Sequence, residues 1–579
     1  MIRTYDDLEL GYVKEVLERG QLGWITPGGM QEQFEKALEI QPDYEGAKAK
    51  GVRFVRARPH SIDPGKDHHG VTLRYTTEDG RMETEDFDLA VLSIGMEPTA
   101  DSQRLAEIFG LELDHYRFAK TTDFAPVSTN RPGVFVAGAF QAPKAIPRSV
   151  AEASTAACEA AVALMASRGE LTRQKTYPAE RSLSADEVRI GVFVCSCGIN
   201  IAGIINVDEV TRYARTLPNV VLAENNLFSC SADTQELMAK KISEHRLNRV
   251  VIAACTPRTH EPLFQDTLMV SALNPYLVEM ANIRNQNAWV HQREPERATA
   301  KAKDQVRMAV AKAALNQPIR RGKVNVVPKA LVVGGGMAGM QAALSLADQD
   351  FETVLVEKSE RLGGNGWNVN TSDRGLAVRP FLEGVIERVE HHPKIKVLKN
   401  AELKTAVGSV GSFVSAVRVD GEERAVTYGV AVIATGGRES RPEEYLYGQD
   451  PRVLTHLEFD AVLRDDPAAL KKAQSVVFIQ CVGSRDERRP YCSRVCCTHS
   501  VKAAIALKEL NSQMNIYVIN RDIRTYGERE DLYRKARDLG VIFIRYDLDR
   551  KPMVRKDGDG LAFDVFDPIL QMSVSIAAD

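Results

Sequence analysis

Residues 329–340, KALVVGGGMAGM, carry the strongest fold signal in this chain. They predict a strand, a glycine-rich turn and the start of a helix, and Gly334, Gly336 and Gly339 satisfy the pattern G-x-G-x-x-G. In a βαβ unit the first glycine permits a tight turn, the second lets the backbone approach a pyrophosphate, and the third lets the helix pack closely. The next expected strand, 353–357, ends in Glu357, which is placed for a ribose hydroxyl. The sequence therefore predicts a dinucleotide-binding α/β domain.

Two segments after this fingerprint favour FAD over NAD. Residues 362–365, LGGN, follow the acid, and residues 432–437, VIATGG, end another expected strand. Both resemble segments of the flavoproteins that are like glutathione and thioredoxin reductase. The resemblance implies that FAD is also held by Gly363, Gly364, Asn365, Thr435, Gly436 and Gly437.

Two segments within residues 1–165 resemble segments that lie nearer the C-terminus in flavoproteins of the same class. Residues 93–98, SIGMEP, and 134–138, VFVAG, look like the segments that close over the flavin, so Gly95 and Gly138 join the predicted FAD site. The class usually carries an acid near the ribityl chain after the second of these glycines, whereas Ala139 follows Gly138 here.

The composition of the 579 residues is that of a soluble globular protein of three or four domains, with 44% hydrophobic and 26% charged residues. A net charge of −3 gives no case for binding nucleic acid or an anionic membrane surface. No apolar run is long enough to span a membrane, and the polar start of the chain is unlike a secretory signal. We therefore expect a cytoplasmic protein without a membrane span of its own.

The nine cysteines divide unevenly along the chain. Cys158 stands alone in an alanine-rich stretch, where a small buried side chain is expected. The other eight form two groups of four. In a protein without a secretory signal disulfides are disfavoured, so such groups indicate ligands of a metal or a cluster.

The first group is Cys195, Cys197, Cys230 and Cys255. The runs 189–194, 219–223 and 249–253 predict strands of a parallel sheet with crossover helices, and the cysteines follow the carboxyl ends of those strands. Because these ends share one edge of the sheet, the four thiolates would converge there and fit a 4Fe-4S cluster. A four-cysteine zinc site and ordinary buried cysteines remain open as alternatives.

The second group lies within 17 residues after the strand-like run 475–479, and it consists of Cys481, Cys492, Cys496 and Cys497. Adjacent cysteines are unusual in the common paired zinc sites, and the spacing differs from that of bacterial ferredoxins. We predict a second 4Fe-4S cluster here, so that the expected cofactors are FAD and two such clusters.

Four consecutive regions are expected. Residues 1–165 would be the C-terminal-type half of an FAD-binding unit, 166–187 a linker, 188–318 the α/β domain of the first cysteine group, and 319–579 the FAD-binding Rossmann domain with the second group. The chain also repeats itself in part, because residues 2–5 (IRTY) recur at 523–526 and residues 51–56 (GVRFVR) resemble 540–545 (GVIFIR). The last region therefore ends in a partial repeat of the first.

The partial repeat predicts either a truncated segment of a tandem fusion or a circularly permuted unit. In both cases residues 1–165 need a partner for their apolar faces, and we expect them to pack on 328–579 with Gly138 facing the Gly334 turn. Residues 89–95, LAVLSIG, are expected to form a core strand.

Together these motifs resemble the A subunit of heterodisulfide reductase and its relatives. The resemblance is carried by residues 193–198 (FVCSCG), 253–264 (AACTPRTHEPLF) and 480–497, and it covers nearly the whole chain. It implies an oxidoreductase subunit of anaerobic metabolism, whose flavin divides an electron pair between acceptors of different potential. The implied partners form a hetero-oligomer with it: redox subunits like heterodisulfide reductase B and C, hydrogenase- or formate dehydrogenase-linked subunits, or ferredoxin.

The same resemblance implies that the second cysteine group holds the cluster nearest the flavin. Lys502 would lie near the flavin N5 as the catalytic residue, where a cation could stabilise a reduced, anionic flavin. An ordinary helix-surface lysine is the alternative.

Two features depart from the family. Residues 370–430 contain no cysteine, whereas many members carry two ferredoxin-type clusters there. The flavin-closing segments also precede the fingerprint in this chain.

Two other functions are less well supported. A stand-alone pyridine nucleotide-disulfide oxidoreductase would need a CxxxxC pair after Gly364 and a second fingerprint after the strand at 475–480, where this chain has Cys481 instead. A non-catalytic cluster scaffold would not carry a flavin that a low-potential donor bleaches reversibly.

Overall fold

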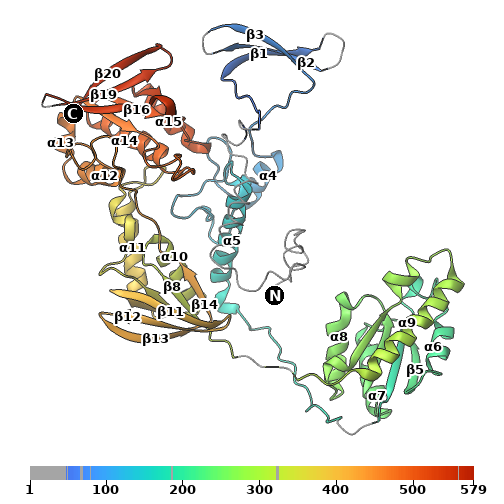
Figure 1. Cartoon of the computed structure of the whole chain (residues 1–579). Helices are drawn as coiled ribbons and strands as arrows, with labels where there is room; N and C mark the ends of the chain where they lie inside the picture. Colours follow the sequence, from blue (N-terminus) through green and yellow to red (C-terminus); the bar gives the residue numbers. More distant parts are fainter. Residues whose placement is uncertain are drawn as a thin grey trace. The chain divides into compact units, whose positions relative to one another are not determined.

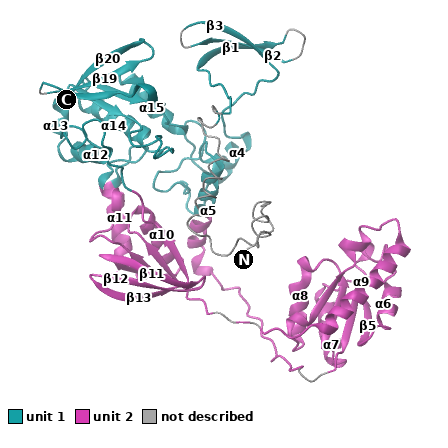
Figure 2. Ribbon diagram, viewed as in Figure 1, with its two compact units in different colours: residues 1–156, 368–378, 438–579 teal, residues 157–367, 379–437 magenta. Residues whose placement is uncertain are grey.

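The computed structural model describes residues 47, 50–65, 70–77, 80–183, 187–320, 322, 325–558 and 560–579. The chain folds into two compact units (Figure 2): one contains residues 1–156, 368–378 and 438–579, and the other contains 157–367 and 379–437. The repeated motif at 2–5 lies outside the described residues. The four consecutive regions expected from the sequence remain a prediction.

Residues 188–318 form a parallel sheet with crossover helices, as the sequence predicts (Figure 1). A fourth strand, β7, joins the three expected ones, and the strand order is β5-β4-β6-β7. The two central strands, β4 and β6, are buried from end to end, which is typical of a parallel sheet covered on both faces. The strands are β4 (Ile190–Cys195), β5 (Val220–Asn226), β6 (Arg249–Ala254) and β7 (Val278–Asn282). The helices are α6 (Val207–Ala214), α7 (Ala232–Glu244), α8 (Pro257–Val270) and α9 (Pro295–Leu315).

The fingerprint domain contains a second parallel sheet, with the order β10-β9-β8-β14, and an antiparallel sheet of β11, β12 and β13. The fold class is therefore α/β with a Rossmann-like domain, as predicted. The parallel strands are β8 (Lys329–Val333), β9 (Glu352–Val356), β10 (Ile395–Leu398) and β14 (Val430–Ile433). The antiparallel strands are β11 (Ala401–Ser409), β12 (Ser412–Val419) and β13 (Glu422–Tyr428), and the helices are α10 (Met337–Ala347) and α11 (Val378–His391).

Residues 438–579 repeat this arrangement. A parallel sheet in the order β15-β16-β17 is followed by an antiparallel sheet of β18, β19 and β20. The parallel strands are β15 (Ser475–Ile479), β16 (Asn515–Asn520) and β17 (Ile542–Arg545), and the antiparallel strands are β18 (Met553–Asp557), β19 (Gly560–Asp567) and β20 (Met572–Ala578). The helices are α12 (His456–Asp465), α13 (Pro467–Lys472), α14 (Cys496–Leu510) and α15 (Glu530–Asp538).

The first region also contains a three-stranded antiparallel sheet, made of β1 (Ala57–Pro64), β2 (Val71–Thr77) and β3 (Met82–Phe87), together with the helices α4 (Ala100–Phe109) and α5 (Ile146–Ala163). The strand expected at 89–95 is not formed: this run has no regular secondary structure, and Leu89, Val91 and Ile94 are 75–84% exposed. A strand needs a neighbour to pair with its backbone groups, and none of the described strands pairs with this run.

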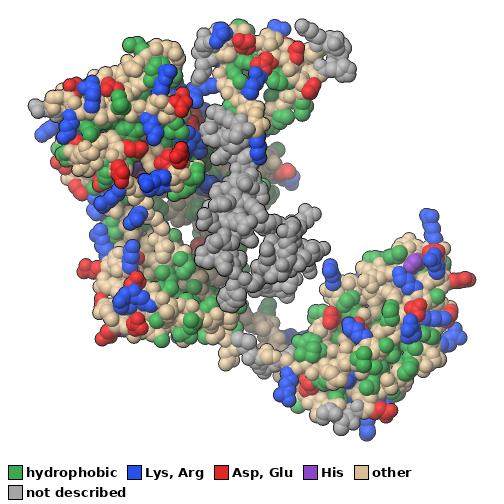
Figure 3. Space-filling view, in the orientation of Figure 1, with side chains coloured by type: hydrophobic (Ala, Val, Ile, Leu, Met, Phe, Trp, Pro, Cys, Tyr) green, Lys and Arg blue, Asp and Glu red, His purple; other side chains and the backbone are tan. Residues whose placement is uncertain are grey.

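The visible surface carries charges of both signs in a mixed pattern (Figure 3), in keeping with the small net charge of −3. Of the helices in the described part of the chain, none is both long and apolar enough to cross a bilayer.

Candidate functional site

The fingerprint turn has the backbone shape that a phosphate cradle requires. Gly334 has φ of 111°, and a side chain there would collide with the carbonyl of Ala434 on the neighbouring strand end. A side chain at Gly339 would collide with the carbonyl of Gly334, so this glycine lets α10 pack against the turn. A Cβ at Gly336, by contrast, would have no atom within 4 Å. The turn therefore leaves open space where the helix N-terminus can receive a pyrophosphate.

Glu357 lies directly after β9, and its carboxylate faces the turn. Its Oε2 accepts a hydrogen bond from the backbone N–H of Gly335 at 2.6 Å, and its Oε1 accepts one from Ser359 at 2.8 Å. The side chain is buried against the fingerprint, which is the position expected for an acid that binds a ribose.

The two other predicted loops meet the fingerprint turn. Gly363 donates its N–H to the carbonyl of Gly335 at 2.8 Å, and both Gly363 and Gly364 have positive φ. Asn365 then donates from Nδ2 to the carbonyl of Gly437 at 2.8 Å. The structure therefore brings together the predicted residues of three loops in this unit: Gly334, Gly336, Gly339, Glu357, Gly363, Gly364, Asn365, Thr435, Gly436 and Gly437.

Trp367 supports this arrangement and was not predicted from the sequence. Its Nε1 donates to the carbonyl of Leu362 at 2.7 Å, and the ring fills the space that a side chain at Gly363 would occupy. The guanidinium groups of Arg361 and Arg379 lie 5.0 and 5.6 Å from the ring centre. A tryptophan shortly after a double glycine was the only sequence signal for it.

These observations fit FAD as the resident group of the fingerprint domain. The glycines at 334 and 339 are required by close backbone contacts, whereas Gly336 faces open space, and an acid lies beside the turn. Gly95 and Gly138 belong to the other unit, so their part in the flavin site remains a prediction.

The first cysteine group lies at one edge of the sheet β5-β4-β6-β7. Cys195 ends β4, and its sulfur accepts a hydrogen bond from the N–H of Ser229 at 3.3 Å. Cys197, with φ of 43°, donates its N–H to the carbonyl of Leu227 at 2.9 Å. Cys255 follows β6, and Cys230 lies in the loop between β5 and α7. The three strand ends thus place all four cysteines on the carboxyl edge, as predicted.

Burial is the largest influence on the pKa of two thiols of this edge, Cys195 and Cys255. It raises the pKa of Cys195 and of Cys255, and the nearby Arg284 opposes the shift of Cys255 only in part. A nucleophilic or redox-active cysteine needs a lowered pKa, so the direction is opposite to that of a disulfide-exchanging thiol. Among the described residues, no three His, Cys, Asp or Glu side chains stand close enough to hold a single metal ion. Their assignment as cluster ligands remains a prediction.

The second cysteine group fills the loop between β15 and the first turn of α14. Cys481 lies two residues after the end of β15 and has a φ of 63°. Cys496 begins α14, and the next residue, Cys497, is buried. Arg494 donates its N–H to the sulfur of Cys492 at 3.3 Å. Burial raises the pKa of Cys481, of Cys496 and, to about 11, of Cys497. These thiols are also unlike redox-active cysteines of the disulfide oxidoreductase type.

Lys502 lies on α14, one and a half turns after Cys497. Its Nζ donates to the carbonyl of Thr371 at 2.7 Å, and burial lowers its pKa. Lys502 and Thr371 belong to the same unit, and Lys502 is half-buried there. The role of Lys502 beside the flavin remains a prediction.

A network of polar side chains beside Lys502 was missed by the sequence analysis. The rings of His456 and His499 stack with 4.6 Å between their centres. His499 contacts Asp460 at 2.9 Å, and His456 contacts Ser500 at 2.7 Å. Burial and the neighbouring His499 lower the pKa of His456 to about 4. These side chains come from α12 and α14, which are too far apart in sequence for a local pattern to reveal the network.

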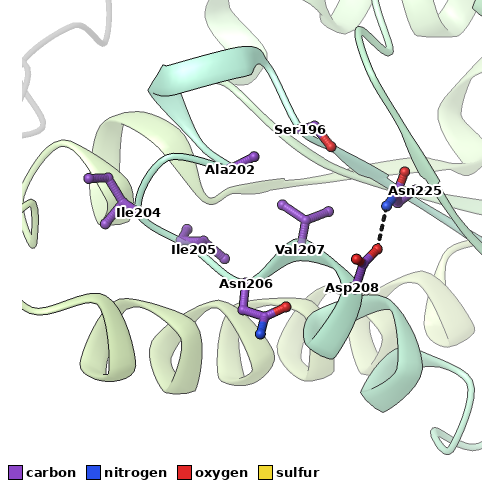
Figure 4. A pocket seen from close by; sticks show the side chains of 8 residues that line it. All are labelled: Ser196, Ala202, Ile204, Ile205, Asn206, Val207, Asp208 and Asn225. Atoms are coloured by element: carbon purple, nitrogen blue, oxygen red, sulfur yellow. Dashed lines mark hydrogen bonds between the residues drawn. The ribbon is translucent and has the colours of Figure 1, made fainter.

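A shallow pocket of about 420 Å³ lies beside the first cysteine group (Figure 4). Asp208, its only ionisable lining residue, accepts a hydrogen bond from Asn225 at 2.6 Å. The carboxylate is therefore already engaged, and the pocket holds no pair of acid and base. The lining consists of Ser196, Ala202, Ile204, Ile205, Asn206, Val207, Asp208 and Asn225.

Comparison with known proteins agrees with this description. Residues 328–478 match the family model of pyridine nucleotide-disulphide oxidoreductases. An iron–sulfur A subunit of the CoB–CoM heterodisulfide reductase of Methanopyrus kandleri, the one numbered 2, is 35% identical over 63% of this chain and 70% of its own length. The A subunit of the H2:CoB-CoM heterodisulfide,ferredoxin reductase of Methanothermobacter marburgensis is also 35% identical, with the same shares.

Among solved structures, the thioredoxin reductase of T. acidophilum aligns with 43% of this chain and 74% of its own, at 16% identity and a TM-score of 0.30. The two A-type relatives match most of their own length at 35% identity. The chain belongs to the family of heterodisulfide reductase A subunits, and it is an oxidoreductase subunit with an FAD-type Rossmann domain.

Proposed function

We propose that this chain transfers electrons between one FAD and two 4Fe-4S clusters, and that it divides the electron pair of the flavin between two acceptors. The observation that supports it most is the meeting of three glycine-bearing loops around the open space at Gly336. FAD accepts two electrons together and can release them singly, which is the chemistry that such a division requires.

Each set of side chains has a distinct task in this proposal. The Gly334–Gly339 turn binds the pyrophosphate and Glu357 binds a ribose. Cys195, Cys197, Cys230 and Cys255 hold one cluster, and Cys481, Cys492, Cys496 and Cys497 hold the other, nearer the flavin. Lys502 holds a positive charge beside the isoalloxazine, and Gly95 and Gly138 close over it.

The relatives suggest what the protein works with. One is named for hydrogen, a heterodisulfide and ferredoxin, and another, from Methanosarcina acetivorans, for ferredoxin and F420H2. We propose redox partners of these kinds, namely subunits like heterodisulfide reductase B and C, a hydrogenase- or formate dehydrogenase-linked subunit, or ferredoxin. The chain would act in a cytoplasmic hetero-oligomer.

The test is anaerobic purification of the full chain followed by cofactor analysis. We expect one FAD and about eight irons per chain, because two four-iron sites are proposed. Dithionite should bleach the flavin reversibly. With its partner subunits, the protein should reduce a low-potential acceptor only while a high-potential acceptor is also present. Stoichiometric zinc would contradict the clusters, and independent reduction of either acceptor would contradict the division of electrons.

A further inference from the structure

The guanidinium group of Arg485 lies between a cysteine sulfur and a carboxylate. Its Nη1 donates to the sulfur of Cys481 at 3.7 Å and also pairs with Oδ1 of Asp522. Asp522 itself accepts a hydrogen bond from Nε of Arg524 at 2.9 Å, and its backbone carbonyl lies 3.9 Å from the sulfur of Cys497. The side chain of Arg485 is only 14% exposed, so its charge is largely shielded from water.

Two loops hold Arg485 in this position. Within the cysteine loop its N–H donates to the carbonyl of Tyr491, and its φ of 59° turns the chain back toward Cys481. From the loop after β16, Arg521 donates through Nη1 to the carbonyl of Arg485 at 2.7 Å. The charge is therefore fixed by contacts on both its backbone and its side chain.

We propose that Arg485 raises the reduction potential of the cluster held by Cys481, Cys492, Cys496 and Cys497, through its fixed charge and its hydrogen bond to the Cys481 sulfur. This inference rests on the proposed function, because it requires that these cysteines hold a cluster.

The physical reason is the sign of the charge that reduction adds. Each electron makes a four-thiolate cluster more negative, and a cation nearby stabilises the reduced form more than the oxidised form. Hydrogen bonds to ligand sulfurs act in the same direction. Asp522 opposes the effect, but Arg485, Arg521 and Arg524 together outweigh it, leaving a formal charge of +2 for the four side chains (three positive, one negative).

A potentiometric titration of the full-length, anaerobically purified protein tests this, with the cluster followed by electron paramagnetic resonance. In Arg485→Gln we expect the equilibrium constant for reduction to fall about tenfold or more, a potential about 59 mV lower for a one-electron couple. Arg485→Lys keeps the charge but loses the planar fork. In this variant we expect the equilibrium constant for reduction to fall at least threefold, but by less than in Arg485→Gln. Arg488→Gln is the control, because Arg488 is exposed in the same loop.

The results separate this inference from the proposed function. A wild-type protein without iron at this group would overturn the proposed function itself. A fully loaded Arg485→Gln protein with an unchanged potential, or an Arg488→Gln protein with an equal shift, would overturn only the role of Arg485. If Arg485→Gln does not retain the cluster, Arg485→Lys decides: a lowered potential supports the inference, and an unchanged one overturns it.

Discussion

The fingerprint domain and residues 438–579 use the same order of elements for different purposes. Each has a strand, a helix, a strand, a helix and a third strand in a parallel sheet, followed by a three-stranded antiparallel sheet. Even a backbone contact recurs: Gly429 donates to the carbonyl of Lys329, which begins β8, and Asp579 donates to that of Ser475, which begins β15. The connection after the first strand is what differs.

In the fingerprint domain residues 334–336 join the strand to its helix, whereas residues 480–495 do so in the second domain. The short connection offers backbone N–H groups without side chains, which suits a phosphate. The long one offers four thiols. The residue after the second strand changes as well: Glu357 turns its carboxylate to the glycine turn, while Arg521 turns its guanidinium to the cysteine loop. One topological position thus carries opposite charges, each suited to the group proposed beside it.

The largest expected effect is the loss of flavin on replacing Gly336 by valine. The new side chain would enter the open space proposed for the pyrophosphate, and FAD should fall below detection while the iron content stays unchanged. Flavin absorbance and iron analysis of the purified protein measure both. Gly384→Val is the matched control, because Gly384 also faces open space but lies on the exposed side of α11. Normal flavin content in Gly336→Val would refute the fingerprint as the binding site.

The second prediction concerns the cysteine loop. Cys496→Ala should lose about four of about eight irons and keep its FAD, because only one four-cysteine site is broken. Cys158→Ala, which changes the cysteine outside both groups, should keep all of its iron. If Cys496→Ala retained the full iron content, the assignment of the second group would be wrong.

The third prediction is that the protein becomes less stable at acidic pH because of His456. Its pKa is lowered to about 4 in the folded protein, so the unfolded chain takes up the proton first as pH falls below about 6.5. The stabilisation that the neutral His456 provides is fully present above about pH 6.5. As the pH falls toward about 4, the free energy of unfolding decreases by on the order of 3 kcal/mol. His499 and Asp460 face the same ring and share the network.

Urea unfolding at about pH 7 and about pH 5 measures this loss. We expect His456→Gln to reduce the difference between the two conditions. His115→Gln, at a histidine that is 71% exposed, should leave it as in the wild type. An unchanged difference in His456→Gln would show that other groups cause the acid sensitivity.

The smallest expected effect is that of Trp367→Phe. The phenylalanine keeps most of the ring but loses the hydrogen bond to Leu362, which should cost about 1 kcal/mol and weaken FAD binding about fivefold. Fluorescence titration of the flavin-free protein gives the affinity. Trp289→Phe, whose hydrogen bond goes to Asn200 in the other α/β domain, should bind FAD normally. Equal losses in both variants would show that Trp367 acts only through general stability.

The sequence was sufficient for the features that depend on local patterns. Short apolar runs rich in β-branched residues, such as 249–253, predicted their strands, because a strand covered on both faces needs no alternation of polar and apolar residues. The glycine spacing predicted the turn, and the sequence also placed Glu357 at the end of the second strand, whereas its hydrogen bond to Gly335 was seen only in the structure. The cysteines at strand ends were placed correctly on one edge of the sheet.

Features that depend on distant contacts could not be predicted in this way. Arg485 and Asp522 are 37 residues apart, and no local pattern pairs them. The stacked histidines come from different helices. Residues 89–95 have the composition of a strand, but pairing decides whether a strand forms, and the described structure gives this run no partner.

The exposed run 89–94 bears on how the protein behaves at high concentration. Its apolar side chains are largely in water, and β15 pairs with a described strand on one side only. Unpaired strand-forming segments and open sheet edges are the usual starting points of edge-to-edge aggregation. We therefore expect the tendency of the protein to aggregate to depend on whether residues 89–94 are covered, independently of any cofactor that the protein holds.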